Sequence, residues 1–381
     1  MKRLILFCGL IFTAQFAACA RKTGTLIPLP CSIEQGKYVV TVETAVGPRR
    51  FVFDTGCPRT VVCEKLCNEL RLAETGRKEL GDFEGFRASA TMARLPYLQM
   101  GGTTFRNRPV IVLPDSSYVF RCLHVDGLIG CDLFGKFAVR FTDSTLTLAN
   151  DYRDFGGLDR KKATRIYFGK RPIIAFRAGS EMAEMELYAL FDSGSSTYFS
   201  CRYFECSALI EQGILHDVRQ TTGYRPGVGW TNRSAAREAV RGVIPTLELD
   251  GTTLEQVPVE ETHGGSNKIG LGLLHYGTIV IDFPKRCFWL LPHAETPVRP
   301  TITIYGIVPA LNGNRLVVGQ IWDESLAEVV SPGDWILRVG TIDVSEIDPC
   351  AFIRREIQSD KPEITVRRND GTIITVPIKK L

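Results

Sequence analysis

The feature that most constrains the fold of this 381-residue chain is a duplicated turn that carries an aspartate. In the first copy an apolar strand, Phe51–Phe53, runs into Asp54-Thr55-Gly56. In the second copy Met185–Phe191 runs into Asp192-Ser193-Gly194. A cysteine follows each aspartate by nine residues, so the two copies align here without a gap. A strand that ends in a glycine-containing turn is typical of β-structure, and its repetition indicates two related halves.

Three further pairs of landmarks follow in the same order in both halves. They are the turns at Gly101–Phe105 and Asp250–Leu254, the glycine-ended elements at Gly127–Gly130 and Lys268–Gly270, and the closing hairpins at Phe137–Leu148 and Thr278–Leu291. Each half is about 120 residues of short strands, which predicts a mainly β chain with a closed or sandwiched sheet in each half. Two homologous halves normally pack about a pseudo-twofold axis, where the two aspartate turns would meet.

Two carboxyl groups that meet at such an axis form a pair suited to activating water. At about 3 Å they cannot both ionise readily at neutral pH, so they share a proton. One carboxylate takes a proton from water while its protonated partner hydrogen-bonds a scissile carbonyl, and this needs no metal and no other cofactor. The glycines permit the sharp turns, and the hydroxyls of Thr55 and Ser193 can bond across the axis. The alternative is a pair of ordinary structural turns.

At these residues the chain resembles the aspartic peptidases, and the size of each half is similar to the retropepsin-like unit. The resemblance implies two fused retropepsin-like β-barrel lobes. We call residues 28–152 the first repeat and residues 163–293 the second repeat. The implied catalytic residues are Asp54 and Asp192. The residues implied to support them are Thr55, Gly56, Ser193, Gly194 and Ser195.

Two positions depart from the pattern of that family. Cys57 replaces the usual Ser or Ala, so we expect a weak thiol near Asp54 where the second repeat offers the Ser195 hydroxyl near its own aspartate. Lys268 stands at an apolar position of the second glycine-ended element, which predicts imperfect packing there.

The same resemblance implies a mobile hairpin, or flap, that covers the substrate. In the first repeat, the glycines and aromatic residues at 81–86 favour Phe83 and Phe86 as flap residues. In the second repeat, residues 223–230 favour Tyr224 and Trp230. Ordinary surface hairpins are the alternative for both stretches.

Cysteines follow the two aspartate turns at matching places. Cys63 with Cys67, and Cys201 with Cys206, resemble the small-loop disulfides of pepsins. Loops this tight gain little entropy from closure, and four free, buried thiols are the alternative. Connectivity cannot be derived from the sequence alone.

The chain beyond the proline-containing stretch 292–300 has the length of one small domain, residues 301–381. Its Tyr305-Gly306-Ile307 resembles the carboxylate-binding loop of PDZ domains, and Gly333–Leu337 resembles a strand entry of the same family. The resemblance implies a PDZ-like β-sandwich with a helix that binds C-terminal peptides. Docking of this loop on the peptidase core is the alternative.

The N-terminus has the form of an export signal. Lys2 and Arg3 precede the apolar run Leu4–Phe12, and small residues follow. Phe16-Ala17-Ala18-Cys19 resembles a bacterial lipobox, which predicts lipidation of Cys19 in a periplasmic, outer-membrane or cell-surface lipoprotein. An ordinary cleavage site next to an accidental cysteine is the alternative.

Together these features predict an exported aspartic endopeptidase that acts on peptides or proteins. The net charge of +4, or +2 without Lys2 and Arg3, is too small to indicate nucleic acid as a partner. We expect membrane association through a lipid anchor rather than a span, and a monomer with a pseudo-dimeric core. The alternative function is a non-catalytic exported scaffold in which the peptidase core is degenerate and the PDZ domain binds peptides.

Overall fold

The computed structural model describes residues 24–380 apart from residues 83, 168, 170, 226–228, 232–233, 294–298, 300–304 and 354–362. Strands hold 52% of the chain and helices 13%, and the sheets are barrel-like, so the predicted mainly β class is confirmed. Within the described ranges, no helix is long and apolar enough to span a membrane.

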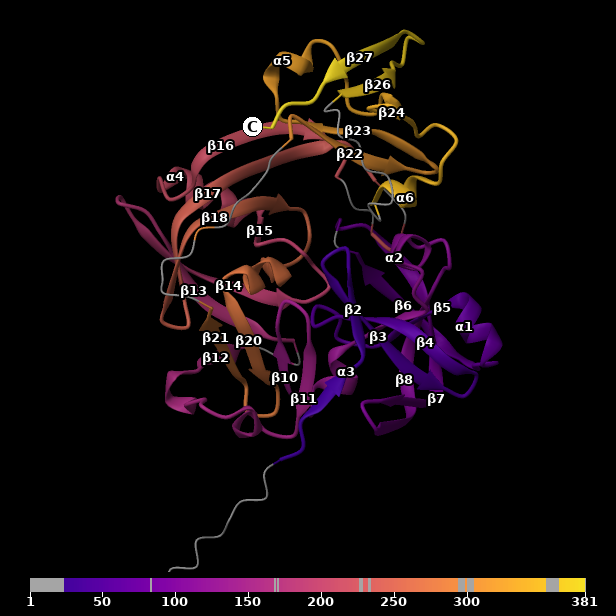
Figure 1. The fold of residues 1–381 in the computed structure, drawn as a ribbon, viewed down its shortest axis with the longest axis vertical. Coiled ribbons are helices and arrows are strands. Elements are labelled where there is room, and N and C mark those ends of the chain that lie inside the picture. The colour runs from indigo at the N-terminus through magenta and orange to yellow at the C-terminus, as the bar shows by residue number, and fades with distance from the viewer. Residues whose placement is uncertain are drawn as a thin grey trace, which may run out of the picture.

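The first repeat forms an eight-stranded sheet in the order β2-β3-β4-β9-β5-β8-β7-β6 (Figure 1). Strand β4 runs parallel to β9, with Phe53 opposite Ile129, so the strand that leads into Asp54 lies inside the sheet between β3 and β9. The strands are β2 (Cys31–Glu34), β3 (Lys37–Thr44), β4 (Gly47–Phe53), β5 (Val61–Cys63), β6 (Glu74–Gly81), β7 (Arg87–Met100), β8 (Thr103–Leu113) and β9 (Gly127–Ile129), and the helices are α1 (Glu64–Glu69), α2 (Tyr118–Leu123) and α3 (Cys131–Phe134).

The second repeat pairs its strands in the same way. Strand β14 runs parallel to β19, with Phe191 opposite Ile269, as β4 does with β9. Strand β15 runs parallel to β18, as β5 does with β8. The elements are β13 (Ile173–Gly179), β14 (Glu184–Asp192), β15 (Phe199–Arg202), α4 (Tyr203–Glu211), β16 (His216–Gly223), β17 (Arg237–Leu249), β18 (Thr252–Thr262), β19 (Lys268–Gly270) and the 3-10 helix η3 (Leu271–His275).

Both predicted glycine turns lie where the sequence places them. Gly101 and Gly102 join β7 to β8, and Asp250 and Gly251 join β17 to β18. All four residues have positive φ, from 54° to 73°, which glycine adopts freely and aspartate tolerates, so these short hairpin turns form without strain.

The two closing hairpins pair with each other and join the repeats. Strand β10 (Ala138–Phe141) lies antiparallel to β20 (Gly277–Asp282), with Ala138 opposite Asp282. Beside them lie β1 (Ile27–Leu29), β11 (Leu146–Ala149), β12 (Thr164–Tyr167) and β21 (Cys287–Pro292), and the 3-10 helices η1 (Tyr152–Phe155) and η2 (Arg160–Lys162) follow β11.

Aromatic rings from the two repeats share one core at this junction. The ring centroids of Phe53 and Phe141 lie 5.9 Å apart, those of Phe141 and Phe191 lie 5.5 Å apart, and those of Phe191 and Phe288 lie 5.9 Å apart. All four side chains are fully buried. Because one hydrophobic cluster runs through both repeats, the two aspartate turns are held on a common rigid support.

The C-terminal region, residues 305–380, forms a separate six-stranded sheet with its own core. Its strands include Arg315–Ile321 and Trp335–Val339, and a hairpin turns around Gly371. The elements are β22 (Ile307–Asn312), β23 (Arg315–Ile321), α5 (Glu324–Ala327), β24 (Trp335–Val339), β25 (Ile342–Asp343), α6 (Pro349–Ile353), β26 (Glu363–Arg367) and β27 (Ile373–Pro377).

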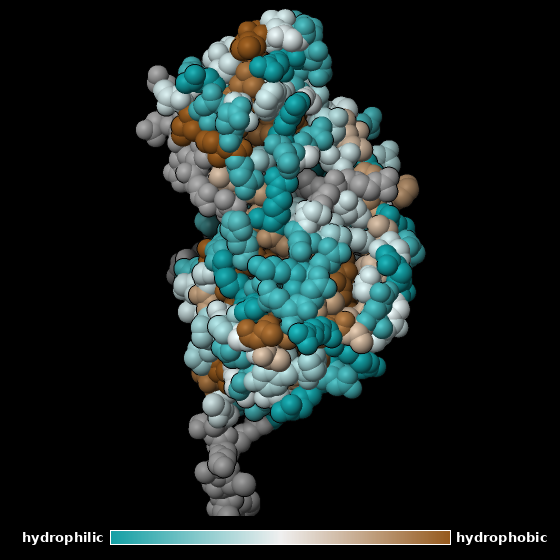
Figure 2. All heavy atoms as spheres, turned by 90° about the vertical axis from the view of Figure 1, so that its right-hand side faces the viewer, coloured by the Kyte–Doolittle hydropathy of each residue, from teal (hydrophilic) through white to brown (hydrophobic). Residues whose placement is uncertain are grey.

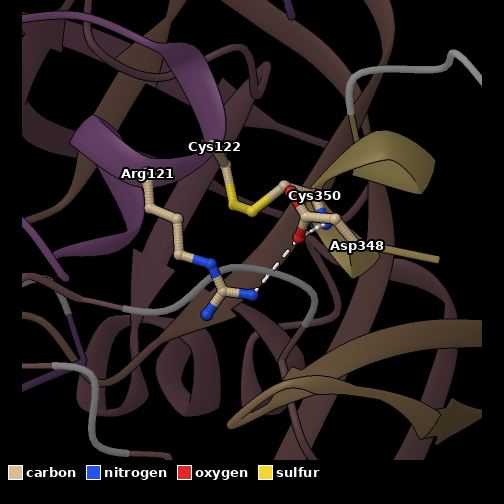
Figure 3. The surroundings of a disulfide bond; sticks show 4 residues. All are labelled: Arg121, Cys122, Asp348 and Cys350. Atoms are coloured by element: carbon tan, nitrogen blue, oxygen red, sulfur yellow. Dashed lines mark hydrogen bonds and ion pairs between the residues drawn. A yellow bond between two sulfur atoms is a disulfide. The ribbon is translucent and has the colours of Figure 1, made fainter. Parts of the chain in front are cut away.

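This region is attached to both repeats. A disulfide joins Cys122 on α2 to Cys350 on α6, and next to it Arg121 forms an ion pair of 3.3 Å with Asp348 (Figure 3). On the second repeat, the end of β16 contacts β23 by two hydrogen bonds. Thr221 Oγ1 donates to the carbonyl of Ile321 at 2.7 Å, and the N–H of Tyr224 donates to the carbonyl of Gly319 at 2.9 Å.

The face of the molecule that carries the first repeat is mostly hydrophilic, and its hydrophobic areas are small and separate (Figure 2). Strand β6 is exposed along almost its whole length. The described residues of this face therefore offer no broad apolar surface to a partner.

Candidate active site

The two aspartate turns pack directly against each other. A Cβ atom placed on Gly56 would lie 2.5 Å from Asp192 Oδ1, and one placed on Gly194 would lie 2.8 Å from the Asp54 carboxyl carbon. Each turn therefore needs glycine at this position because the opposite carboxyl group occupies the space that a side chain would fill. The structure thus brings together the two acids predicted from the duplicated motif.

Thr55 and Ser193 exchange hydrogen bonds across the junction. The N–H of Thr55 donates to Ser193 Oγ at 3.0 Å, and the N–H of Ser193 donates to Thr55 Oγ1 at 2.8 Å. Each hydroxyl in turn donates to a carbonyl of the other repeat, Thr55 to Phe191 at 2.6 Å and Ser193 to Phe53 at 2.7 Å. Both residues are fully buried, so these four bonds fix the relative position of the two turns.

Each carboxyl group also accepts hydrogen bonds from its own turn. Asp54 Oδ1 accepts from the N–H of Gly56 at 2.8 Å and from the N–H of Cys57 at 3.1 Å. Asp192 Oδ1 accepts from the N–H of Gly194 at 3.0 Å.

The side chains of Cys57 and Ser195 make local hydrogen bonds. The Cys57 thiol donates to the carbonyl of Arg59 at 2.9 Å. The Ser195 hydroxyl shares a hydrogen bond of 2.9 Å with Thr197 Oγ1. In both turns, backbone N–H groups donate to the aspartate carboxyl group. The two side chains bond instead to residues two positions further along the chain.

Lys268 pairs with one of the two acids. Its Nζ lies 2.9 Å from Asp192 Oδ2, with 21% of the lysine side chain and 7% of the aspartate side chain exposed. The predicted packing defect at this position is instead an ion pair. The sequence reasoning missed this pair, and a cation within an otherwise apolar element beside an acidic turn is the signal that could have revealed it.

The two acids differ in their tendency to ionise. Burial raises the pKa of Asp54 to about 7, and the negative charge of Asp192 acts in the same direction. Burial also opposes ionisation of Asp192, but the Lys268 ammonium outweighs it and holds the pKa of Asp192 below its ordinary value. Burial disfavours the ammonium form of Lys268 as well, yet its pKa is raised because the two carboxylates outweigh that effect.

The two predicted flap stretches contact each other. Thr231 Oγ1 donates to Asp82 Oδ2 at 2.6 Å, and Trp230 Nε1 donates to the carbonyl of Gly81 at 3.4 Å. The Arg237 guanidinium donates to the carbonyl of Glu84 at 3.0 Å and lies 4.8 Å from the ring centroid of Phe86. The hairpin β6–β7 of the first repeat and the hairpin β16–β17 of the second therefore meet at their tips.

The other predicted flap residues have different surroundings. Tyr224 follows β16 and contacts the C-terminal region through its backbone, as described above. Phe83 lies outside the described residues. The buried Glu84 carboxyl, at the tip of the first hairpin, is close enough to Lys268 for that charge to act on its pKa, although burial is the dominant effect and raises it.

The cysteines expected in small-loop disulfides are thiols. Cys63, Cys67, Cys201 and Cys206 are all unbridged. The bridge between Cys122 and Cys350 spans 228 residues of sequence, and no local spacing pattern could reveal it. Cys19, the predicted lipidation site, lies outside the described residues.

The predicted carboxylate-binding loop of the C-terminal region already has bonds within the chain. The N–H of Gly306 donates to the carbonyl of Lys379 at 2.9 Å, and Tyr305 pairs with Lys380. Ile307 begins β22 and is buried. At least one backbone donor of this loop is thus used by the residues that follow β27.

Fold and site together define a mainly β chain whose sheets hold two buried, mutually bonded aspartate turns. A model of the aspartyl protease family matches residues 39–133, from β3 to α3, and includes the turn at Asp54. This similarity to a peptidase family suggests hydrolase activity. No curated protein matches the chain.

Proposed function

We propose that the protein is an exported aspartic endopeptidase whose catalytic residues are Asp54 and Asp192. The observation that carries the proposal is the contact between the two aspartate turns, with the reciprocal bonds of Thr55 and Ser193. The family match supports the peptidase assignment for the first of these turns.

In this proposal the pair works with one proton between its carboxyl groups. Water adds to the carbonyl carbon of a peptide bond as the ionised acid takes one of its protons. The protonated acid gives its proton to the carbonyl oxygen, which yields a neutral diol. The carbon–nitrogen bond then breaks as the first acid returns its proton to the amine nitrogen and a diol hydroxyl gives its proton to the second acid, which restores the starting pair. The pseudo-twofold relation of two retropepsin-like lobes, residues 28–152 and 163–293, fits this symmetric arrangement.

The two hairpin tips would act as paired flaps. Because Asp82 bonds to Thr231 and Arg237 bonds to Glu84, a polypeptide substrate needs these contacts to open before it reaches the aspartates. We propose that residues 301–381 are a PDZ domain that recruits substrates or partners, and that it influences the second flap through the contact at Tyr224. We also propose that the protein is exported and is anchored to a membrane by a lipid at Cys19.

The test is cleavage of a diverse peptide pool by the purified chain, with and without a pepstatin-type inhibitor. We expect inhibitable cleavage by the native chain and none by Asp54→Asn or Asp192→Asn. Cleavage that persists in either variant would reject the two aspartates as the catalytic pair.

One observation favours a second function, a non-catalytic scaffold with a degenerate core. The ion pair of Lys268 with Asp192 makes the two acids unequal. In that case the C-terminal region would bind peptides, and the native chain would cleave nothing in the pool while still binding immobilised C-terminal peptides.

A further inference from the structure

Lys268 occupies a position that the first repeat fills with leucine. In the first repeat Leu128 lies opposite Val52, one residue before the Ile129–Phe53 pair. In the second repeat Lys268 lies opposite Leu190, one residue before the Ile269–Phe191 pair. The two repeats therefore place an apolar side chain and an ammonium group at the same register position beside their aspartate turns.

The ammonium acts unequally on the two acids. Lys268 Nζ contacts Asp192 Oδ2, and among the ion pairs of the described residues none includes Asp54. Asp54 instead receives two neutral backbone donors on Oδ1, from Gly56 and Cys57. These donors favour its ionised form, but less than an ammonium in direct contact favours that of Asp192, so the shared proton stays at Asp54.

We propose that Lys268 is a positioning residue that assigns the two roles of the pair: Asp192 stays ionised and takes the proton from water, and Asp54 keeps its proton and donates it to the carbonyl oxygen. This inference rests on the proposed peptidase function. Protons are conserved in these steps, because after the first step Asp192 is neutral and Asp54 is ionised. The collapse of the diol then returns the Asp192 proton to the leaving amine and a hydroxyl proton to Asp54.

Other charged and titratable groups also face the pair. Burial lowers the pKa of Lys37, at the start of β3, although both aspartates oppose this, so Lys37 is less able than Lys268 to hold a positive charge. The charge of Asp54 also acts on the thiols of Cys57 and Cys131. Arg171 and Glu84 interact with the charge of Lys268. Among the ion pairs of the described residues, that of Lys268 is the only one with either acid, so it should dominate the difference between them.

The first test is the pH–rate profile of peptide cleavage by Lys268→Leu and Lys268→Arg. Leucine is the residue of the first repeat at this position, and arginine keeps the charge. An opposite charge at this distance lowers an acid's pKa by about 1–3 units, so we expect Lys268→Leu to move the acidic limb upward by about one pH unit or more. The arginine variant should keep the native limb. If both variants keep the native profile, or if both shift equally, Lys268 does not set the roles.

The second test does not depend on catalysis, so it separates failure of this inference from failure of the proposed function. At pH 7–8, Asp192→Asn leaves a partly buried ammonium without its carboxylate, whereas Asp54→Asn imitates the protonated state. We expect the melting temperature of Asp192→Asn to fall by roughly 10 °C more than that of Asp54→Asn. Adding Lys268→Leu to Asp192→Asn should recover most of the loss. Equal losses, or no recovery, would overturn the assignment even if the native chain cleaves peptides.

Discussion

Cys122 and Cys350 join the first repeat to the C-terminal region, with their Cα atoms 4.9 Å apart and a sequence separation of 228. The hydrophobic core of the C-terminal region includes Cys122, so the bridge lies within a packed contact rather than on an exposed tether. Together with the contact of Thr221 with Ile321, it holds the region against both repeats.

The first prediction concerns this bridge. Closing a loop of this length restricts the unfolded chain, so we expect a Cys122→Ser/Cys350→Ser variant to lose about 2–5 kcal/mol of unfolding free energy. Chemical denaturation with and without a reductant measures the loss. The reductant should destabilise the native chain and leave the double variant unchanged. Mass mapping of the native chain that finds both cysteines as thiols would contradict the prediction.

The second prediction concerns the bonds between the two aspartate turns. Thr55→Val removes a buried hydroxyl and leaves the N–H of Ser193 and the carbonyl of Phe191 without these partners. Each buried group left unsatisfied costs about 1–3 kcal/mol, so we expect a loss of about 2–5 kcal/mol in urea denaturation. Thr41→Val, at an exposed position on β3, is the matched control and should change stability by under about 0.5 kcal/mol. Similar losses in both variants would show that the bonds at Thr55 are not the cause.

The third prediction is the pH dependence of stability. Because the pKa of Asp54 rises from 3.8 to about 7 on folding, the folded chain binds a proton between these values that the unfolded chain has released. This contribution to stability is therefore present below pH 4 and is lost as the pH rises to about 7, by up to about 4 kcal/mol. Denaturation of the native chain and of Asp54→Asn across this range isolates the effect. The difference between the two curves should change steadily between pH 4 and 7, and a constant difference would exclude the shifted pKa.

The fourth prediction concerns the N-terminus and rests on the sequence alone. Cys19→Ser should release the protein from the membrane fraction to the soluble exported fraction, because an acylated cysteine supplies the anchor. Fractionation of cells that express the two forms measures the change. The prediction is wrong if the serine variant remains in the membrane fraction.

Much of the fold could be predicted because its signals are local. Alternation of buried and exposed residues in β3, where Val40 and Val42 are buried and Thr41 and Glu43 are exposed, is a property of neighbours along the chain. The turns at Gly102 and at Asp250-Gly251 follow from which residues tolerate positive φ. The repeated motif also predicted that Asp54 and Asp192 would meet, since related halves tend to pack symmetrically.

What the sequence by itself determined is therefore the mainly β class, the duplicated hairpins and the identity of the two acids. Only the tertiary structure decided the features that make the acids unequal and link the parts: the Lys268–Asp192 ion pair, the bridge from Cys122, and the contact between Asp82 and Thr231. These partners lie 76 residues or more apart in sequence. Whether such groups meet depends on how whole sheets pack and on which buried polar groups must find a partner. Local periodicity and spacing in the sequence contain no information about these contacts.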